Sequence, residues 1–122
     1  MKYILLLTAL LLTATTAHSK GEDGNKLLNQ CIEAVRFQDG IMDVDSEKAS
    51  NCLSYLEGLK AGLFLWQEVG EASITCIPGG VLNGQASRIV VEYGRKNPSI
   101  LHKNHIVLAV RALQDAFPCE ET

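Results

Sequence analysis

The sequence has neither a surplus of basic residues nor a second long apolar run after its first 19 residues. Its 122 residues include 11 Lys and Arg against 14 Asp and Glu, which gives a formal net charge of −3. Without a basic stripe, nucleic acid is a poor partner for this protein. A membrane-spanning helix needs about 20 apolar residues, so we expect the mature chain to be soluble, with no membrane segment.

Two further patterns are missing, one typical of strands and one typical of zinc sites. No segment alternates apolar and polar residues with period two for long, and the apolar residues instead recur at helical spacing. The four cysteines show no C-x-x-C spacing, which argues against a zinc site. The chain also has no internal repeat and no linker. We therefore predict a single small all-α domain without a cofactor.

No constellation for catalysis or for a metal ion stands out in this chain. An EF-hand loop that starts at Asp43 fails, because Lys48 and Ser54 stand where a glycine and an acid are required. His102 and His105 are three residues apart on one predicted helix, but no cysteine or carboxylate lies near them at ligand spacing. No Ser/His/Asp or Cys/His arrangement is present either. We predict a protein that is not an enzyme, with no catalytic and no metal-ligating residues.

The first residues are typical of a cleavable secretory signal peptide. A short positive start is followed by an apolar run over 3–12 and then by small residues. This order matches an export signal rather than a buried helix or a membrane span. We predict a signal peptide over 1–19, cleaved after Ala17 or Ser19, and a mature domain over 20–122.

Helical periodicity and capping residues predict four main helices in the mature chain. We expect the fourth to begin at Pro98, with Asn97 as its cap, because proline suits the first turn of a helix. Pro118 should stop it. The expected helices cover residues 25–37, 46–69 (or 50–69), 82–93 and 98–117.

The positions of the four cysteines predict how they pair. In an antiparallel helical hairpin, residues that are equidistant from the turn face each other. Cys31 and Cys52 are equidistant from the first predicted turn, and Cys76 and Cys119 from the second. Of the three possible connectivities, we therefore expect Cys31–Cys52 and Cys76–Cys119, one bridge for each of two helical hairpins. We expect the second bridge to matter more for global stability, because it closes the longer loop and ties down the C-terminus.

The second predicted helix has more apolar residues than a single apolar stripe along one side of the helix would contain. Gly58 and Gly62 lack side chains at a spacing that lets another helix approach closely, either from the same chain or from a second copy. A small core cannot easily bury every apolar residue of this helix, and leftover patches usually mark interfaces. We therefore predict a homodimer through this helix, whose further apolar residues include Leu53, Leu59, Leu63, Phe64, Leu65 and Trp66.

Short motifs follow one another in a distinctive order along nearly all of the mature chain. They are 24–31 (GNKLLNQC), 52–58 (CLSYLEG) continuing to Trp66-Gln67, 76–81 (CIPGGV), Gln85, 90–93 (VVEY), Asn97-Pro98, Leu101-His102 and 116–119 (AFPC). Their order resembles the type VI secretion amidase immunity proteins, the Rap/Tai family. Ala61 and Leu82 depart from the family, whose members often have an acid and a threonine there.

The resemblance implies a small, helical, periplasmic protein that is usually dimeric and is not an enzyme. It implies binding to a peptidoglycan amidase delivered by type VI secretion, and inhibition of that amidase by blocking its active-site cleft. Two other classes stay open. One is a general periplasmic helical binding or chaperone-like protein with no toxin partner. The other is a metal-dependent enzyme that uses His102 and His105.

We expect the partner to bind at loops, because the residues of the apolar stripes are committed to the core. The turn of the second hairpin is the favoured loop, since a protruding polar tip suits an active-site cleft. Its candidate partner-binding residues are Arg95, Lys96, Asn97, Ser99, His102 and Lys103. The alternative is the connection between the hairpins, with Glu68, Glu71, Ser73 and Thr75.

Overall fold

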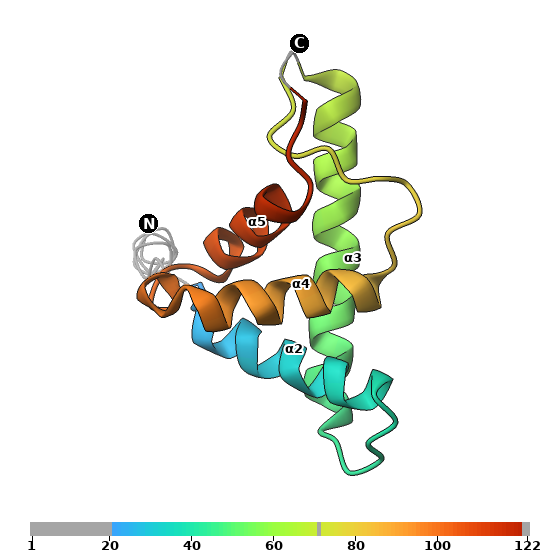
Figure 1. Ribbon diagram of the computed structural model, residues 1–122, viewed down its shortest axis with the longest axis vertical. Coiled ribbons are helices and arrows are strands. Elements are labelled where there is room, and N and C mark those ends of the chain that lie inside the picture. The colour runs from blue at the N-terminus through green and yellow to red at the C-terminus, as the bar shows by residue number, and fades with distance from the viewer. Residues whose placement is uncertain (1–20, 71, 121–122) are drawn as a thin grey trace, which may run out of the picture.

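The structure is a computed structural model that describes residues 21–70 and 72–120, and these residues form an all-helical domain (Figure 1). Its helices are α2 (Gly24–Gln38), α3 (Ser46–Val69), α4 (Asn83–Lys96), the short 3-10 helix η1 (Pro98–Ile100) and α5 (His105–Ala116). The described part of the chain contains no strand, only an isolated antiparallel bridge between Asp23 and Asn104. The prediction of one small all-α domain with four main helices is confirmed. The predicted signal peptide over 1–19 lies outside the described residues.

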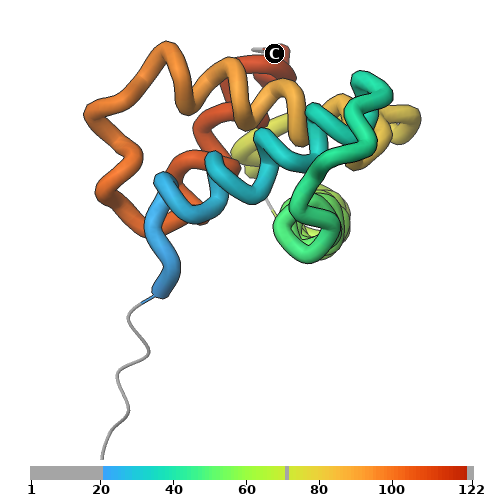
Figure 2. Tube along the Cα trace, turned by 90° about the horizontal axis from the view of Figure 1, so that it is seen from below, coloured from blue at the N-terminus to red at the C-terminus, as the bar shows by residue number. Residues whose placement is uncertain are grey.

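The helices form two hairpins that pack across each other. In Figure 1, α2 and α4 lie side by side and α3 crosses them, while α5 lies on the other side of α4 from α2. Figure 2 looks along α3 and shows α2 passing over it. The core forms where the helices meet. Its buried apolar residues are Leu27, Cys31, Ala34, Ala49, Cys52, Leu56, Ala86, Val90, Val91, Ile100, Leu108, Ala109, Ala112 and Leu113.

Polar side chains begin three of the helices by accepting backbone hydrogen bonds that the first turn leaves unpaired. The carboxylate of Asp23 accepts from the amide of Lys26 at the start of α2, and that of Asp45 accepts from Lys48 at the start of α3. The amide oxygen of Asn104 accepts from the backbone N–H of Ile106 at 3.0 Å. These caps fix where the helices start.

The predicted start of the fourth helix at Pro98 is wrong, because α5 begins only at His105. Pro98 opens η1 instead, and the chain then turns. Contacts with the start of α2 hold this turn: the carbonyl of Leu101 accepts from the backbone N–H of Asn25 at 3.1 Å, and that of Lys103 accepts from Gly24 at 2.9 Å. These long-range bonds use carbonyls that a continuous helix would have paired within itself.

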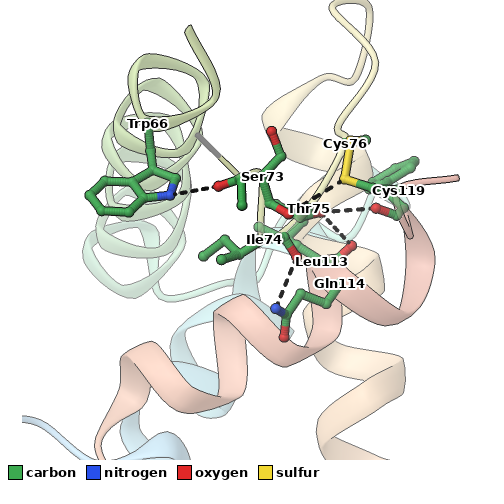
Figure 3. Close-up of a disulfide and its surroundings, with 10 residues drawn as sticks. Trp66, Ser73, Ile74, Thr75, Cys76, Leu113, Gln114 and Cys119 are labelled. Atoms are coloured by element: carbon green, nitrogen blue, oxygen red, sulfur yellow. Dashed lines mark hydrogen bonds between the residues drawn. A yellow bond between two sulfur atoms is a disulfide. The ribbon is translucent and has the colours of Figure 1, made fainter. Parts of the chain in front are cut away.

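The predicted disulfide pairing is confirmed. Cys31 bonds to Cys52 and Cys76 bonds to Cys119, and in each pair the Cα atoms are 5.0 Å apart. The first bridge joins α2 to α3 inside the core, where both residues are fully buried. The second joins the segment before α4 to the segment after α5, so it closes the second hairpin from just outside its helices (Figure 3).

Candidate partner-binding surfaces

The turn between α4 and α5 carries most of the predicted partner-binding residues on its surface. We call residues 95–103 the hairpin tip. Asn97 is half-buried, and its side-chain amide donates to the carbonyl of Tyr93 at 2.9 Å, which ends α4. Asn97 is therefore part of the scaffold. The other five predicted residues are exposed on the tip, namely Arg95, Lys96, Ser99, His102 and Lys103.

The hairpin tip is held firmly against the rest of the domain. Besides the two backbone bonds to the start of α2, the N–H of His105 donates to the carbonyl of Glu22 at 2.9 Å. Ile100 is buried beneath the tip, with 7% of its surface exposed. Gly94 lies so close to Leu28 that a Cβ atom built on Gly94 would be 3.1 Å from Cδ1 of Leu28. A loop that is already ordered loses little conformational entropy when it binds a partner.

The two histidines of the possible metal site, His102 and His105, have different surroundings. His102 is exposed on the tip, whereas the ring of His105 packs edge-on against Tyr55, with centroids 4.8 Å apart. Burial raises the pKa of Tyr55 to about 12. His105 thus tethers the start of α5 to α3. No group of three or more His, Cys, Asp or Glu side chains that could hold a metal ion occurs within 21–70 and 72–120.

The second half of α3 presents an apolar surface of a different kind. All buried residues of α3 belong to its first half, and the last of them is Leu56. Leu53, Leu59 and Leu63 pack against the edge of the core. We call the four large exposed apolar residues beyond them the α3 apolar face: Phe64 (63% exposed), Leu65 (60%), Trp66 (56%) and Val69 (73%).

The two glycines of α3 lie next to this face and have no neighbour in the described chain. A Cβ atom built on Gly58 or Gly62 would meet no atom within 4 Å. Of the two alternatives for a closely packed helix, one from the same chain is therefore not found among the described residues. A second copy of the chain is the alternative that remains for this part of α3.

A groove runs between the second half of α3 and the segment that connects the two hairpins. Its volume is about 470 Å³, and Lys60, Phe64, Ile77 and Leu82 are among the residues that line it. The ammonium of Lys60 donates to the carbonyl of Val81 at 2.6 Å and so ties α3 to the connecting segment. Phe64 belongs both to the lining of this groove and to the α3 apolar face.

The connecting segment is pinned to α5 near the second disulfide, as Figure 3 shows. Thr75 is buried, and its hydroxyl lies 3.2 Å from the carbonyl of Leu113 and 3.0 Å from that of Phe117. The side chain of Gln114 donates to the carbonyl of Ile74 at 2.9 Å. Thr75 therefore has a structural role, which weakens the alternative loop as a binding site. Glu71 of that loop lies outside the described residues.

The turn of the first hairpin is held by charged side chains. The carboxylate of Glu33 accepts from the backbone N–H of Asp45 at 2.9 Å and pairs with Arg36. Arg36 also donates to the carbonyl of Asp43 at 2.9 Å. The Asp45 amide, followed by the Arg36 guanidinium, lowers the pKa of Glu33. This turn therefore depends on an ionised carboxylate.

The fold and these surfaces define a small, disulfide-bridged helical protein whose prominent features are exposed surfaces suited to a partner protein. All four cysteines are in disulfides, so none offers a thiol nucleophile. Within the described ranges, no helix combines the length and apolar character needed to cross a bilayer.

A family model for the Rap1a immunity proteins matches residues 23–119. The match covers most of the chain, and the chain belongs to this family, as the order of its motifs indicated. Family membership implies an immunity role toward a type VI effector, and therefore an effector protein as partner. Searches of curated proteins and of solved structures found no match to the chain.

Proposed function

We propose that this protein is a periplasmic immunity protein that binds a type VI-secreted peptidoglycan amidase and blocks its active-site cleft. The family match over 23–119 is the observation that carries the proposal. The two disulfides suit an oxidising compartment, and the sequence of residues 1–19 fits an export signal. The protein acts by binding and performs no catalysis of its own.

The hairpin tip is the part of the molecule that we propose enters the amidase cleft. Five of its predicted binding residues are exposed, and hydrogen bonds to the start of α2 hold it in place. A rigid, polar protrusion excludes the amidase's substrate without a large entropic cost on binding.

We further propose that the protein is a homodimer through the α3 apolar face. Leu65, Trp66 and Val69 are exposed and share one side of α3, because 65 and 69 are four residues apart and 66 and 69 are three apart. Exposed apolar patches mark interaction sites. Gly58 and Gly62 leave room beside the face for the backbone of a second α3. The dimer would leave both hairpin tips available, because the α3 apolar face belongs to the first hairpin and the tip to the second.

A protection assay tests the proposed function. A type VI amidase effector from the same bacterium is directed to the periplasm of a laboratory strain, with and without this protein. We expect lysis with the effector alone and growth when the full chain is co-expressed. A matched chain without residues 1–19 should fail to protect, because it stays in the cytoplasm.

In parallel, the purified chain should suppress peptidoglycan cleavage by the purified effector at equimolar concentration. Full amidase activity in a mixture that forms no complex would contradict the proposal.

A further inference from the structure

Charge is divided unevenly between the two hairpin turns of this protein. The run from Tyr93 to Asn104 contains Arg95, Lys96 and Lys103 but no Asp or Glu. The other residues therefore include 8 of the 11 basic residues and all 14 acidic ones, which gives −6 for the rest of the chain against +3 for the run. The protein is acidic overall and yet carries a basic turn between α4 and α5.

The three basic side chains of the tip are exposed and available to a partner. The four ion pairs found within the described ranges involve other residues. The turn between α2 and α3 is rich in carboxylates, and Figures 1 and 2 both place it at a different end of the molecule from the tip. Glu22 and Asp23 lie beside the end of the tip, but both are engaged with Lys26, Glu22 in an ion pair and Asp23 as the cap of α2. Among charged side chains, the hairpin tip itself therefore presents only positive ones.

We propose that the basic hairpin tip docks on a rim of acidic side chains around the effector's cleft, and that this attraction accelerates association. The inference rests on the proposed function and adds to it the chemistry of the partner surface. Complementary charge at an interface mainly raises the association rate constant, and it can do so by a factor of about 10 to 1,000. An acidic protein surface also suits the tip because its arginine can bind a carboxylate with two hydrogen bonds.

An anionic membrane is the other class of surface that could attract a basic tip, and the structure disfavours it. No large exposed apolar residue lies between Tyr93 and Asn104, and only Ile106, at the start of α5, follows closely. Three cationic side chains without an apolar anchor bind an anionic bilayer only weakly. The negative charge of the rest of the chain further opposes the approach to such a bilayer.

The test measures the association rate constant for the effector of the protection assay over about 50 to 500 mM NaCl, a range over which the screening length falls severalfold. The variants Lys96→Glu and Lys103→Glu reverse one charge each on the tip. Lys48→Glu, on the first turn of α3, changes the net charge equally and serves as the control. The melting temperature of each variant confirms that it is folded.

For the wild type, we expect the association rate constant to fall about tenfold or more across this salt range. Each tip variant should lower it about tenfold at the lowest salt, whereas Lys48→Glu should change it less than about twofold. A rate constant that ignores salt, or that falls equally with Lys48→Glu, would overturn the inference while leaving the proposed function intact.

Two further outcomes are decisive. If wild type and effector form no complex at any salt concentration, the proposed function fails and the inference fails with it. Wild-type binding to vesicles of phosphatidylcholine with about one third phosphatidylglycerol, lost in Lys96→Glu, would assign the basic tip to a membrane instead.

A probe that needs no effector is poly-L-glutamate, whose addition should shift amide resonances of 95–103 and leave those of 36–48 in place.

Discussion

The two hairpins have the same plan but hold their disulfides in different places. In the first hairpin, Cys31 and Cys52 are fully buried between α2 and α3 and are part of the core. In the second, Cys76 and Cys119 are half-buried and join irregular segments outside α4 and α5. The comparison shows that equal spacing about a turn predicts which cysteines meet, but not what the bridge does for stability.

The turns of the two hairpins differ as well. Ionised side chains hold the first turn, in particular Glu33 and Arg36. Backbone hydrogen bonds to the start of α2 hold the second. We also assign the hairpins different roles, because the α3 apolar face belongs to the first and the basic tip to the second. Each prediction below separates the two hairpins by one measurable property.

The largest expected effect is on the free energy of unfolding when each bridge is replaced by alanines. The bridges span 21 and 43 residues of sequence, and this difference favours the second by only about 0.6 kcal/mol. Removal of buried core atoms adds a packing loss at the first bridge. We therefore expect a loss of about 4–5 kcal/mol for Cys31→Ala/Cys52→Ala and about 2–3 kcal/mol for Cys76→Ala/Cys119→Ala in urea unfolding. A larger loss at the second bridge would restore the ranking by loop length, and equal losses would contradict both orders.

The next prediction concerns self-association. Leu65→Glu places a charge in the α3 apolar face, where burial against a second copy would be costly. We expect wild type to sediment as a dimer at tens of micromolar and Leu65→Glu to sediment as a monomer, with stability of the fold changed by less than about 1 kcal/mol. Lys103→Glu, on the other hairpin, is the matched control and should remain dimeric. A monomeric wild type would refute the dimer.

The smallest effect is the pH dependence of the first turn. Because the pKa of Glu33 is lowered in the folded state, its contribution is complete above its ordinary value of 4.5 and is lost as pH falls through the lower folded value. Glu33→Gln should therefore be less stable than wild type near neutral pH, and the difference should shrink below about pH 4. Glu57→Gln, an exposed change on α3, should show no such convergence. Melting curves between about pH 3 and pH 7 measure it, and a constant difference would argue against this role of Glu33.

Local patterns in the sequence predicted the helix count and the cysteine pairing, because both follow from periodicity and from symmetry about turns. They did not predict the start of α5, because Pro98 and Asn97 favour a helix locally. The backbone N–H groups of Gly24 and Asn25, far away in sequence, donate hydrogen bonds to carbonyls of the turn and so stop the helix from starting there. The same limit applies to Thr75, which the sequence placed in an exposed loop but which bonds to the end of α5.

Exposure was the other property that sequence patterns could not settle. The apolar residues of the second predicted helix continue to Trp66, yet the buried residues of the helix all lie in its first half, and Leu59 and Leu63 beyond it are only partly covered. Periodicity shows which residues share a face, whereas the length of the neighbouring helices decides how much of that face is covered. The exposed tip residues lie at the end of α4 or in the connection that follows it. Asn97 differs because its side chain bonds to the end of α4.

The central claim is that the tip of the second hairpin binds the amidase, and affinity measurements on tip variants test it most directly. Isothermal titration of the purified effector with wild type, Arg95→Ala and His102→Ala gives the dissociation constants, with Arg111→Ala as an exposed control on α5. We predict that each tip variant weakens binding about tenfold or more, while the melting temperature stays within about 2 °C of wild type and Arg111→Ala binds normally. If both tip variants bind the effector as tightly as wild type does, the claim is contradicted.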